Sequence, residues 1–556
     1  MLNTPYLLAI PVLLVIYYFC GYLLRRSRQK LSYPPGPRGL PIIGSFFDVL
    51  TPRTGLDAQW AIYRDMGNMY HSDLLHINIL GNHTVVVNSA KAAEELLERR
   101  SGIYSSRPPM HMAHESGLGY DFGTMPYTSW WRLHRGTFHQ YFRSDAIAAH
   151  HPFIHQATSQ LLRSLSCIQS TTMVTQYDDL RAIVRQHAAS IFLYTTYGIT
   201  EQEDMDAFVK LVNNATESFP TIVHGTFLVD YFPLLRYVPA WFPGAHFKQK
   251  ATRWAQFNSE LLNKPWKQLK ASISSGTAIS CFGTKSLQKF DSTFNTDATG
   301  DTSDLGMSKT DSDTNMEEVI RNCAAVAYTA GSDTSVSLIL ISVLVLSHHP
   351  EIQAKAQEEL DRVLGSTPNA TQLPDFSNRG SLPYVEAILK ELMRMYPSVP
   401  LGLPHCSVAD DVYEGYFIPK GTTVVGNAWT ILHDENIYPD PHTFSPDRFL
   451  RTEPQRGALS VKHSVNPDPE LYAFGFGRRI CPGRHLALDT SWLVLACILA
   501  TCNITRISND KPEIDPIADF ADGLTAHPKP FKCSVTPRSA GAFELMKRGY
   551  DVGVEA

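Results

Sequence analysis

The chain has 556 residues and is 44% hydrophobic, which is enough for a large buried core. Its 49 basic and 54 acidic residues give a formal net charge of −5, so composition shows no nucleic-acid signature. Nine cysteines occur without any Cys-x-x-Cys pair, which argues against zinc and redox-disulfide motifs and suits a reducing compartment. Length alone predicts roughly two to four domains, but no Pro/Gly/Ser-rich linker divides the chain.

The first 24 residues carry no charged side chain, and Tyr6 to Leu24 is almost wholly apolar. Spanning a bilayer takes about 20 such residues. Four basic residues follow between positions 25 and 30, which places the bulk of the protein on the cytosolic side. A cleaved signal peptide is the alternative, but charge before the apolar run and a small-residue cleavage site are both missing. We therefore expect residues 1–30 to form a membrane anchor.

A proline-rich segment at 31–41 predicts a stiff, extended hinge. A short helix is expected over 56–65, a β-hairpin over 74–87 and a helix over 90–100. Residues 101–127 are irregular, and a long loop inside a compact domain is usually functional.

A further helix opens at Ser129, and its Trp131 and Arg135 lie four positions apart on one face. An indole N–H and a guanidinium placed together can hold a carboxylate; an ordinary helix face with a buried Trp is the alternative. Several helices without a chemical motif are expected over 145–270. Residues 272–314 are rich in Ser, Thr, Asp and Gly, which predicts a flexible surface insertion.

Met316 to Ser347 predicts a long apolar helix that contains Ala330-Gly-Ser-Asp-Thr-Ser335. Polar residues and a glycine inside so apolar a helix need a reason. The hydroxyl of Thr334 can turn back to its own helix carbonyls and open a space for water or O₂, and Asp333 can then relay protons. A kink without chemistry is the alternative.

Two helices are expected next, over 350–364 and 382–396. In the second, Glu391 and Arg394 lie three apart and can form an ion pair; a solvated surface pair is the commoner case. Short strands are expected over 412–425, and a terminal β region over 511–537.

The stretch from Phe474 to Gly483 surrounds Cys481 with glycine and proline and precedes an apolar helix-like run. Glycine lets backbone N–H groups approach the sulfur, and the helix N-terminus favours a thiolate. With Phe474 as a shield and Arg479 nearby, such a thiolate suits a haem iron that cleaves O–O. A buried free cysteine is the alternative.

This stretch reads Phe-x-x-Gly-x-Arg-x-Cys-x-Gly and resembles the haem-ligand signature of the cytochrome P-450 family. The resemblance covers roughly residues 33 to 537, with Ser335 in place of the usual Thr and Asp447 in place of the usual Glu. It implies that Cys481 is the axial iron ligand. It further implies roles for three other sets of residues: catalytic Thr334 and Asp333; cofactor-binding Trp131, Arg135, His405, Arg479 and Phe474; and a structural Glu391–Arg394 pair that engages Arg448.

The resemblance implies a mainly α fold with a small β region behind an N-terminal transmembrane helix. The expected units are the anchor (1–30), the hinge (31–41), the catalytic domain (42–540, with the 272–314 insertion) and a C-terminal tail (541–556). The implied activity is that of a haem-thiolate monooxygenase with heme b. Electrons would come from NADPH through a partner reductase, since no Gly-x-Gly-x-x-Gly occurs, with cytochrome b5 as a further donor.

The implied location is the endoplasmic reticulum membrane, single-pass, with the catalytic domain cytosolic. The substrate is expected to be a small hydrophobic molecule of fungal secondary metabolism, a terpenoid or a polycyclic aromatic. Two other functions stay open: a haem-thiolate isomerase or dehydratase without a reductase, which the intact Asp333–Thr334 pair disfavours, and a non-catalytic haem protein. NADPH consumption with a reductase separates all three.

Overall fold

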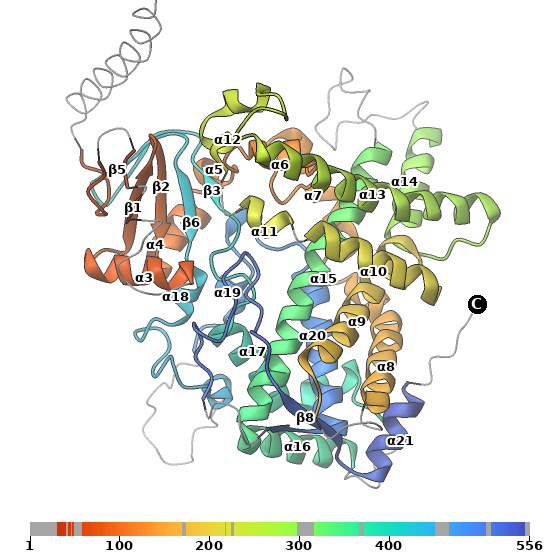
Figure 1. Ribbon diagram of the computed structural model, residues 1–556. Coiled ribbons are helices and arrows are strands. Elements are labelled where there is room, and N and C mark those ends of the chain that lie inside the picture. Colours follow the sequence, from red (N-terminus) through yellow and green to blue (C-terminus); the bar gives the residue numbers. More distant parts are fainter. Residues whose placement is uncertain are drawn as a thin grey trace, which may run out of the picture.

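The computed structural model describes residues 31–40, 43–45, 47–48, 58–168, 174–216, 218–223, 227–296, 316–365, 372–450, 466–507 and 513–550. Helices dominate it; the four-stranded sheet lies at the left of Figure 1, and a two-stranded sheet formed by residues 502–506 and 533–537 lies at the bottom of that view. The predicted membrane span falls in residues 1–30, outside the described part. The helices of the first half are α3 (Gln59–Met69), α4 (Ala90–Ala93), the π-helical η1 (Glu94–Arg99), α5 (Ser101–Tyr104), α6 (His111–Glu115), α7 (Ser129–Phe142), η2 (Ile147–His150), α8 (His151–Ile168), α9 (Tyr177–Tyr197), α10 (Gln202–Thr216), α11 (Ser218–Val223), α12 (Leu228–Tyr231), η3 (Pro233–Tyr237), α13 (His246–Ser275) and α14 (Phe282–Thr296).

The second half contains the longest helix and most of the strands. Its helices are α15 (Met316–His348), α16 (Pro350–Leu364), η6 (Phe376–Ser381), α17 (Pro383–Met395), α18 (Ala428–Leu432), η7 (Pro446–Phe449), α19 (Glu470–Ala473), η8 (Gly477–Arg479), α20 (Arg484–Thr501) and α21 (Ala540–Arg548). The strands of the whole chain are β1 (Leu74–Ile79), β2 (Asn82–Val87), β3 (His405–Cys406), β4 (Asp411–Tyr413), β5 (Tyr416–Ile418), β6 (Thr423–Gly426), β7 (Cys502–Arg506) and β8 (Cys533–Pro537).

The main sheet has the strand order β1-β2-β6-β3. β1 and β2 form the predicted antiparallel hairpin, in which Leu74 pairs with Val87. β2 then runs parallel to β6, and Thr84 pairs with Thr423. The predicted terminal β region reduces to β8, which pairs with β7 at the end of α20. The hairpin and the strands around 412–425 were expected from the sequence, because hydrophobic alternation survives in short elements, whereas β3 and β7 were not expected.

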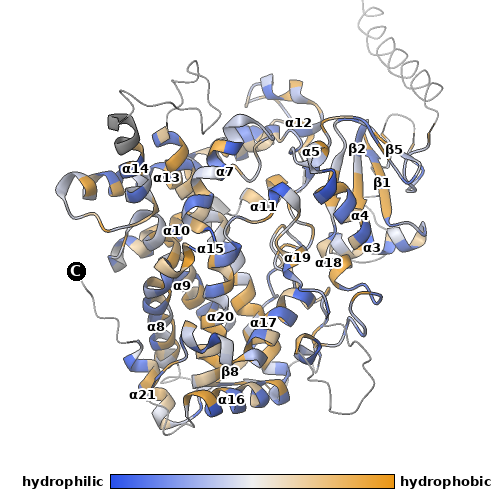
Figure 2. Cartoon of the chain, turned by 180° about the vertical axis from the view of Figure 1, so that it is seen from behind, coloured by the Kyte–Doolittle hydropathy of each residue, from blue (hydrophilic) through white to orange (hydrophobic). Residues whose placement is uncertain are grey.

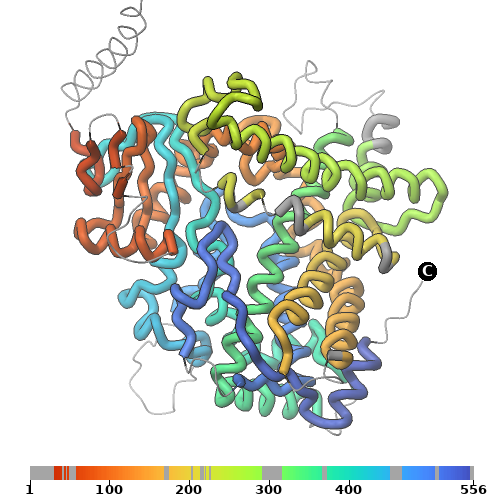
Figure 3. Tube along the Cα trace, viewed as in Figure 1, coloured from red at the N-terminus to blue at the C-terminus, as the bar shows by residue number. Residues whose placement is uncertain are grey.

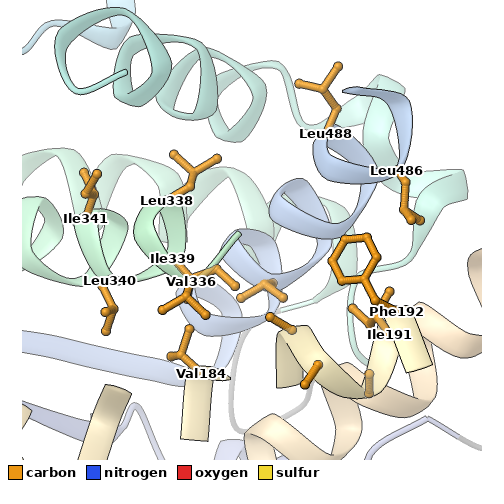
Figure 4. Close-up of a cluster of buried hydrophobic side chains, with 14 of the residues drawn as sticks. Val184, Ile191, Phe192, Val336, Leu338, Ile339, Leu340, Ile341, Leu486 and Leu488 are labelled. Atoms are coloured by element: carbon orange, nitrogen blue, oxygen red, sulfur yellow. The ribbon is translucent and has the colours of Figure 1, made fainter. Parts of the chain in front are cut away.

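The core lies around α15, which is apolar on every side. Its residues pack against α9 and α20, and Figure 4 shows side chains of all three helices meeting there. Hydrophobic residues concentrate on these central helices, while outer loops and helix faces are largely hydrophilic (Figure 2). Among the described residues, α15 alone is long and apolar enough to cross a membrane, but 67% of its apolar window is buried, as in a core helix.

The proline-rich segment is not an isolated spacer. The amide of Phe417 donates to Ser32 O at 2.8 Å, and the amide of His76 donates to Pro35 O at 2.8 Å. The ring of Tyr33 stacks on His76 with 4.7 Å between ring centres. These contacts fasten the start of the described chain to β1 and β5, so the segment expected to act as a free hinge is part of the domain surface.

Two further expectations need correction. Residues 272–296 were expected inside a flexible insertion, yet α13 continues to Ser275 and α14 forms from Phe282, whose ring is fully buried. This segment is polar in composition, but a few of its apolar side chains are buried in the core and stabilise the two helices. Residues 541–548, expected in a C-terminal tail, belong to α21, which packs on α8 and buries Met546 completely. The mainly α fold with small sheets is otherwise confirmed.

Candidate functional site

A cavity lies between the loop that carries Cys481 and the middle of α15. Residues from many separate parts of the chain meet around it, among them the irregular 107–123 segment, α7, α15, the 397–405 segment and the Cys481 loop. Nearly every site residue expected from the sequence lines this one space. They are Trp131, Arg135, Asp333, Thr334, His405, Phe474, Arg479 and Cys481.

The loop around Cys481 owes its shape to two glycines. Gly475 has φ +80° and Gly477 has φ +55°, a region that favours glycine. A Cβ on Gly477 would also overlap the carbonyl of Leu97, and the Gly477 amide donates to Glu98 Oε1 at 2.6 Å. The amide of Cys481 donates to Phe474 O at 2.8 Å. The loop is therefore locked against η1, and it presents the sulfur to the cavity.

The environment of Cys481 does not by itself stabilise a thiolate. Burial raises the pKa of the thiol above its usual value. The backbone N–H of Gly483 and the charges of Arg135 and Arg484 act in the opposite direction but do not outweigh burial. The loop amide of Gly483 and the two arginines act in the direction expected from the sequence, and a bound metal would offset the cost of burying the thiolate.

Arg479 is held in one place by backbone carbonyls and an aromatic ring. Its Nε donates to Ser105 O at 2.6 Å and its Nη2 to Met125 O at 2.7 Å. Its guanidinium carbon lies 4.1 Å from the centre of the Trp131 ring. Burial, with the nearby charges of Arg107 and Arg135, lowers the pKa of Arg479 to about 8.

Arg107 is a second buried arginine at the same edge of the cavity, and the sequence analysis missed it. It is 5% exposed and donates to Leu403 O at 2.7 Å and to Gly123 O at 2.8 Å. Burial lowers its pKa to about 10. In the sequence, Arg107 is a single arginine within the irregular 101–127 stretch. No periodic pattern marks it, because its position in the fold depends on a turn.

The histidine of this cluster is neutral. The Nδ1 of His405 lies 2.9 Å from Tyr104 O, and burial together with Arg107 lowers the pKa of His405 to about 3. The 107–123 segment also contributes Asp121 to the cavity, and its carboxylate accepts a hydrogen bond from the Gly123 amide at 2.7 Å. Burial raises the pKa of Asp121 to about 6, so at neutral pH it is an anion.

The positive charges that line the cavity favour the binding of an anionic ligand. Its charged lining residues are Arg107, Arg135, Arg479, Asp121 and Asp333. Asp333 is already paired with His527, and Arg135 has no hydrogen-bond or ion-pair partner among the described residues. Three guanidinium groups therefore face two carboxylates, one of which is hydrogen-bonded to His527, and a net positive charge remains. A flat metal–porphyrin with two carboxylates beside Cys481 fits this donor set.

The middle of α15 forms the opposite wall. The hydroxyl of Thr334 donates to Ala330 O at 3.0 Å, the turn toward its own helix that the sequence predicted. Asp333 beside it receives a hydrogen bond from Thr525 and an ion pair from His527. At Gly331 a Cβ would overlap the ring of Phe192 on α9, so glycine is required there for packing.

Glu391 lies at the centre of a buried charge cluster away from the cavity. Arg394 donates to it through Nε at 2.7 Å and through Nη2 at 2.9 Å, and both side chains are fully buried. Arg448 donates through Nε at 3.0 Å. The remaining donors of the two arginines reach backbone carbonyls of Leu432, Pro439, Asp440 and Thr443. The structure thus brings together the three residues expected to form a structural lock.

The rest of the cavity wall is apolar. Phenylalanines 122, 138, 192 and 219 line it together with aliphatic residues, among them Leu401, Leu403 and Leu524. Asn258 on α13 adds a polar atom, and it is tied to Ser116 O at 2.7 Å. Such a wall selects a hydrophobic molecule with few polar groups.

Comparison with known proteins agrees with this geometry. A sequence model described as cytochrome P450 — hereafter P-450 — matches residues 34–535. The chain belongs to the cytochrome P-450 family. A cytochrome P-450 monooxygenase of Postia placenta is 38% identical over 548 residues, covering 98% of this chain and 97% of its own. One of Armillaria gallica is 36% identical over 523 residues, covering 94% of each chain.

The relatives described above are fungal and are named monooxygenases, and this P-450 chain is an oxidoreductase of that class. Among solved structures, a zebra fish cytochrome P-450 with progesterone superposes with a TM-score of 0.67. It is 21% identical, and the match covers 86% of this chain and 99% of that one, a likeness in fold.

Proposed function

We propose that this P-450 inserts one oxygen atom from O₂ into a small hydrophobic substrate, with electrons from NADPH delivered by a partner reductase. The observation that carries the proposal is the single cavity in which Cys481, three arginines and the Asp333–Thr334 pair meet. The balanced reaction is R–H + O₂ + NADPH + H⁺ → R–OH + H₂O + NADP⁺. Cytochrome b5 is proposed as a further electron donor.

The residues that would hold heme b are those of the cationic cluster and the cysteine loop. Cys481 would ligate the iron, and Trp131, Arg135, His405 and Arg479 would hold the propionates. When bound, the haem supplies the dioxygen-binding and electron-accepting chemistry that no side chain provides. Phe474 would shield the sulfur from water.

Side chains of the protein would deliver protons to the cavity and keep other water out of it. Thr334 presents a hydroxyl to the cavity while it is tied to Ala330 O, and Asp333 lies beside it. We assign to this pair the ordered delivery of protons to dioxygen in the cavity. A positioned group of this kind typically contributes about 10²–10⁴-fold to rate. The apolar wall keeps other water away.

The apolar wall also supports the proposed substrate class, terpenoids or polycyclic aromatics. Phenylalanine rings supply large contact area for such skeletons. We further propose that residues 1–30 anchor the enzyme in the endoplasmic reticulum membrane with its catalytic domain in the cytosol. The described chain begins on the sheet near Tyr33, so an anchor there would hold this side of the domain toward the bilayer.

Reconstitution with an NADPH-dependent reductase tests the proposal. We expect a red-shifted band in the reduced, carbon monoxide-bound difference spectrum, and NADPH-dependent conversion of a hydrophobic library member to a product heavier by one oxygen atom. Cys481→Ala should abolish the band. A protein that converts a substrate without NADPH would instead be an isomerase or dehydratase, and a haem protein without any turnover would be a binding protein.

A further inference from the structure

We infer that His527 is the proton donor that links solvent to Asp333, and that it acts through Asp333 rather than on the substrate. This inference rests on the proposed function, since it extends the proton pathway assigned there to Asp333 and Thr334. Nothing in the sequence suggested it, because His527 lies 194 positions from Asp333.

The two side chains bridge the inside and the outside of the cavity wall. The Nε2 of His527 lies 3.1 Å from Asp333 Oδ1. Asp333 lines the cavity, while His527 does not. The side chain of His527 is 16% exposed, so it is close to solvent without being free in it. A proton that reaches His527 is therefore one hydrogen bond away from the cavity.

The backbone around His527 is fixed to the helix that carries Asp333. Ser337, one turn after Asp333, donates its hydroxyl to Ala526 O at 2.7 Å. The amide of Ala526 donates to Ser398 O at 2.8 Å, and the amide of Ala521 donates to His527 O at 2.8 Å. The chain leading to β8 thus lies along α15 (Figure 3). These hydrogen bonds hold the imidazole of His527 opposite the carboxylate of Asp333.

The second ring nitrogen of His527 is a place where a proton can enter the ring. Its Nδ1 is buried and has no hydrogen-bond partner among the described residues. Buried polar atoms in folded proteins are almost always satisfied, and a water is the usual partner where no side chain serves. A water at Nδ1 would supply the proton that the ring passes on through Nε2.

The other groups that face Asp333 cannot take this role. They are Thr525, which donates a hydroxyl hydrogen bond, and Arg185 on α9, which acts through its charge. Arg185 in turn lies near Arg181 and Tyr177. A guanidinium does not release its proton in proteins, whereas an imidazole exchanges protons near neutral pH. His527 is the one partner that can both hold Asp333 and protonate it.

The groups around Asp333 keep its carboxylate ionised, so that it can accept a proton. Burial works to raise the pKa of Asp333, but His527, Thr525 and Arg185 together leave it below its ordinary value. Between transfers Asp333 is thus a carboxylate. In a transfer, Nδ1 of the neutral ring takes a proton from solvent through the water, and the imidazolium so formed gives its Nε2 proton to Asp333 Oδ1, which leaves a neutral ring protonated at Nδ1. Asp333 then gives its proton toward Thr334 and dioxygen, which needs two protons with two electrons from NADPH.

The test compares His527→Gln with Ser337→Ala in the full-length holoenzyme. The glutamine keeps a hydrogen-bond donor to Asp333 but cannot carry a proton, whereas Ser337→Ala loosens the same segment and leaves the proton path intact. The measurements are the hydrogen peroxide released and the product formed per NADPH, their pH dependence, and the solvent isotope effect. Haem content and the substrate-induced spectral shift serve as checks of integrity.

We expect His527→Gln to lose about tenfold in product per NADPH and to release more peroxide, consistent with an effect on proton delivery. Ser337→Ala, which loosens the segment but keeps the imidazole, should change this ratio much less than His527→Gln does. A second readout needs no turnover: thermal unfolding of His527→Gln, Asp333→Asn and the double variant should be non-additive if the two side chains interact.

Each result decides something. A His527→Gln enzyme with the wild-type product ratio and pH profile overturns the relay. Equal uncoupling in Ser337→Ala also overturns it, since segment position alone would then explain the loss. A wild-type protein that consumes no NADPH with a reductase overturns the proposed function itself, and the relay with it, even where the unfolding data show the pair.

Discussion

The guanidinium carbon of Arg479 lies 4.1 Å from the centre of the Trp131 ring, so the Cys481 loop and helix α7 meet through one cation–π contact. In the desolvated edge of the cavity such a contact is worth about 2 kcal/mol. It also orients the indole, whose N–H is expected to reach a haem propionate. In the proposed function, this pair would join the sulfur side of the haem site to its propionate side.

Trp131→Phe should therefore weaken haem retention while the fold persists. Phenylalanine keeps a ring beneath Arg479 but lacks the N–H donor, and a hydrogen bond to a charged group is worth about 1.5–3 kcal/mol. We expect about tenfold faster haem transfer to an acceptor protein. Trp130→Phe is the matched control, because Trp130 packs edge-on against His134 instead of lining the cavity. Equal haem loss in both variants would contradict the role of Trp131.

Thr334→Ala should separate chemistry from structure. Haem content and substrate binding should stay close to wild type, since one hydroxyl contributes little to packing, but more NADPH should end as hydrogen peroxide. Ser332→Ala is the control: Ser332 makes the same kind of hydrogen bond, to Tyr328 O at 2.6 Å, yet is absent from the cavity wall. The peroxide-to-product ratio of both variants is the measurement, and full coupling in Thr334→Ala would refute the proton role.

Glu391→Ala should destabilise the protein by about 3–5 kcal/mol, because two buried guanidinium groups lose their anion. Haem occupancy and the midpoint of denaturant unfolding report the effect. Asp447→Asn provides the comparison, since Asp447 pairs with Lys355 at the surface, where the two side chains are 56% and 47% exposed. An exposed pair contributes about 0–1 kcal/mol. A stable, haem-loaded Glu391→Ala protein would show that the cluster is dispensable.

Acid should destabilise the fold through buried neutral histidines. Burial, with a smaller effect of His83, lowers the pKa of His76 from 6.5 to about 4. The unfolded chain therefore takes up this proton first as the pH falls, so the stabilisation is complete above about 6.5 and is lost toward about 4. In His76→Gln, unfolding near pH 5 should take up about one proton fewer. The slope of unfolding free energy against pH measures it, and an unchanged slope would rule it out.

Deleting residues 1–30 should release the enzyme from membranes with haem still bound, because Tyr33 and its neighbours remain fastened to the sheet. Fractionation of truncated and full-length protein is the measurement. One described surface could oppose this outcome: Leu234, Tyr237 and Trp241 are 79%, 73% and 80% exposed. If truncated holoenzyme still sediments with membranes, Trp241→Ala in that background identifies this surface as the second contact.

Elements with a strong local pattern were predictable from sequence. The long helix α15, helix α16 over Pro350–Leu364 and the hairpin around Gly81 were expected within a residue or two, since each depends on periodicity or a turn. The Cys481 loop was predictable for a different reason: its glycines are required by backbone angles and by the close approach to Leu97.

What the sequence could not reveal are relationships set by the tertiary fold. Arg107 sits in an irregular stretch and acquires its place only when the 107–123 segment closes over the cavity. His527 meets Asp333 because a distant turn is tied to α15. The helix α14 was hidden by polar composition, and the burial that raises the pKa of Cys481 depends on packing that loop chemistry does not reveal.

The parallel pairing of β2 with β6 has a consequence for synthesis. Thr84 is synthesised 339 residues before its pairing partner Thr423, so the main sheet cannot form until both have been made. At 5–20 residues per second this delay is roughly 17–70 s on the ribosome. During that time the Leu74–Val87 hairpin has an unpaired edge of valines, a template for wrong association. Expression yield should therefore depend on chaperones that cover this edge until the last third of the chain emerges.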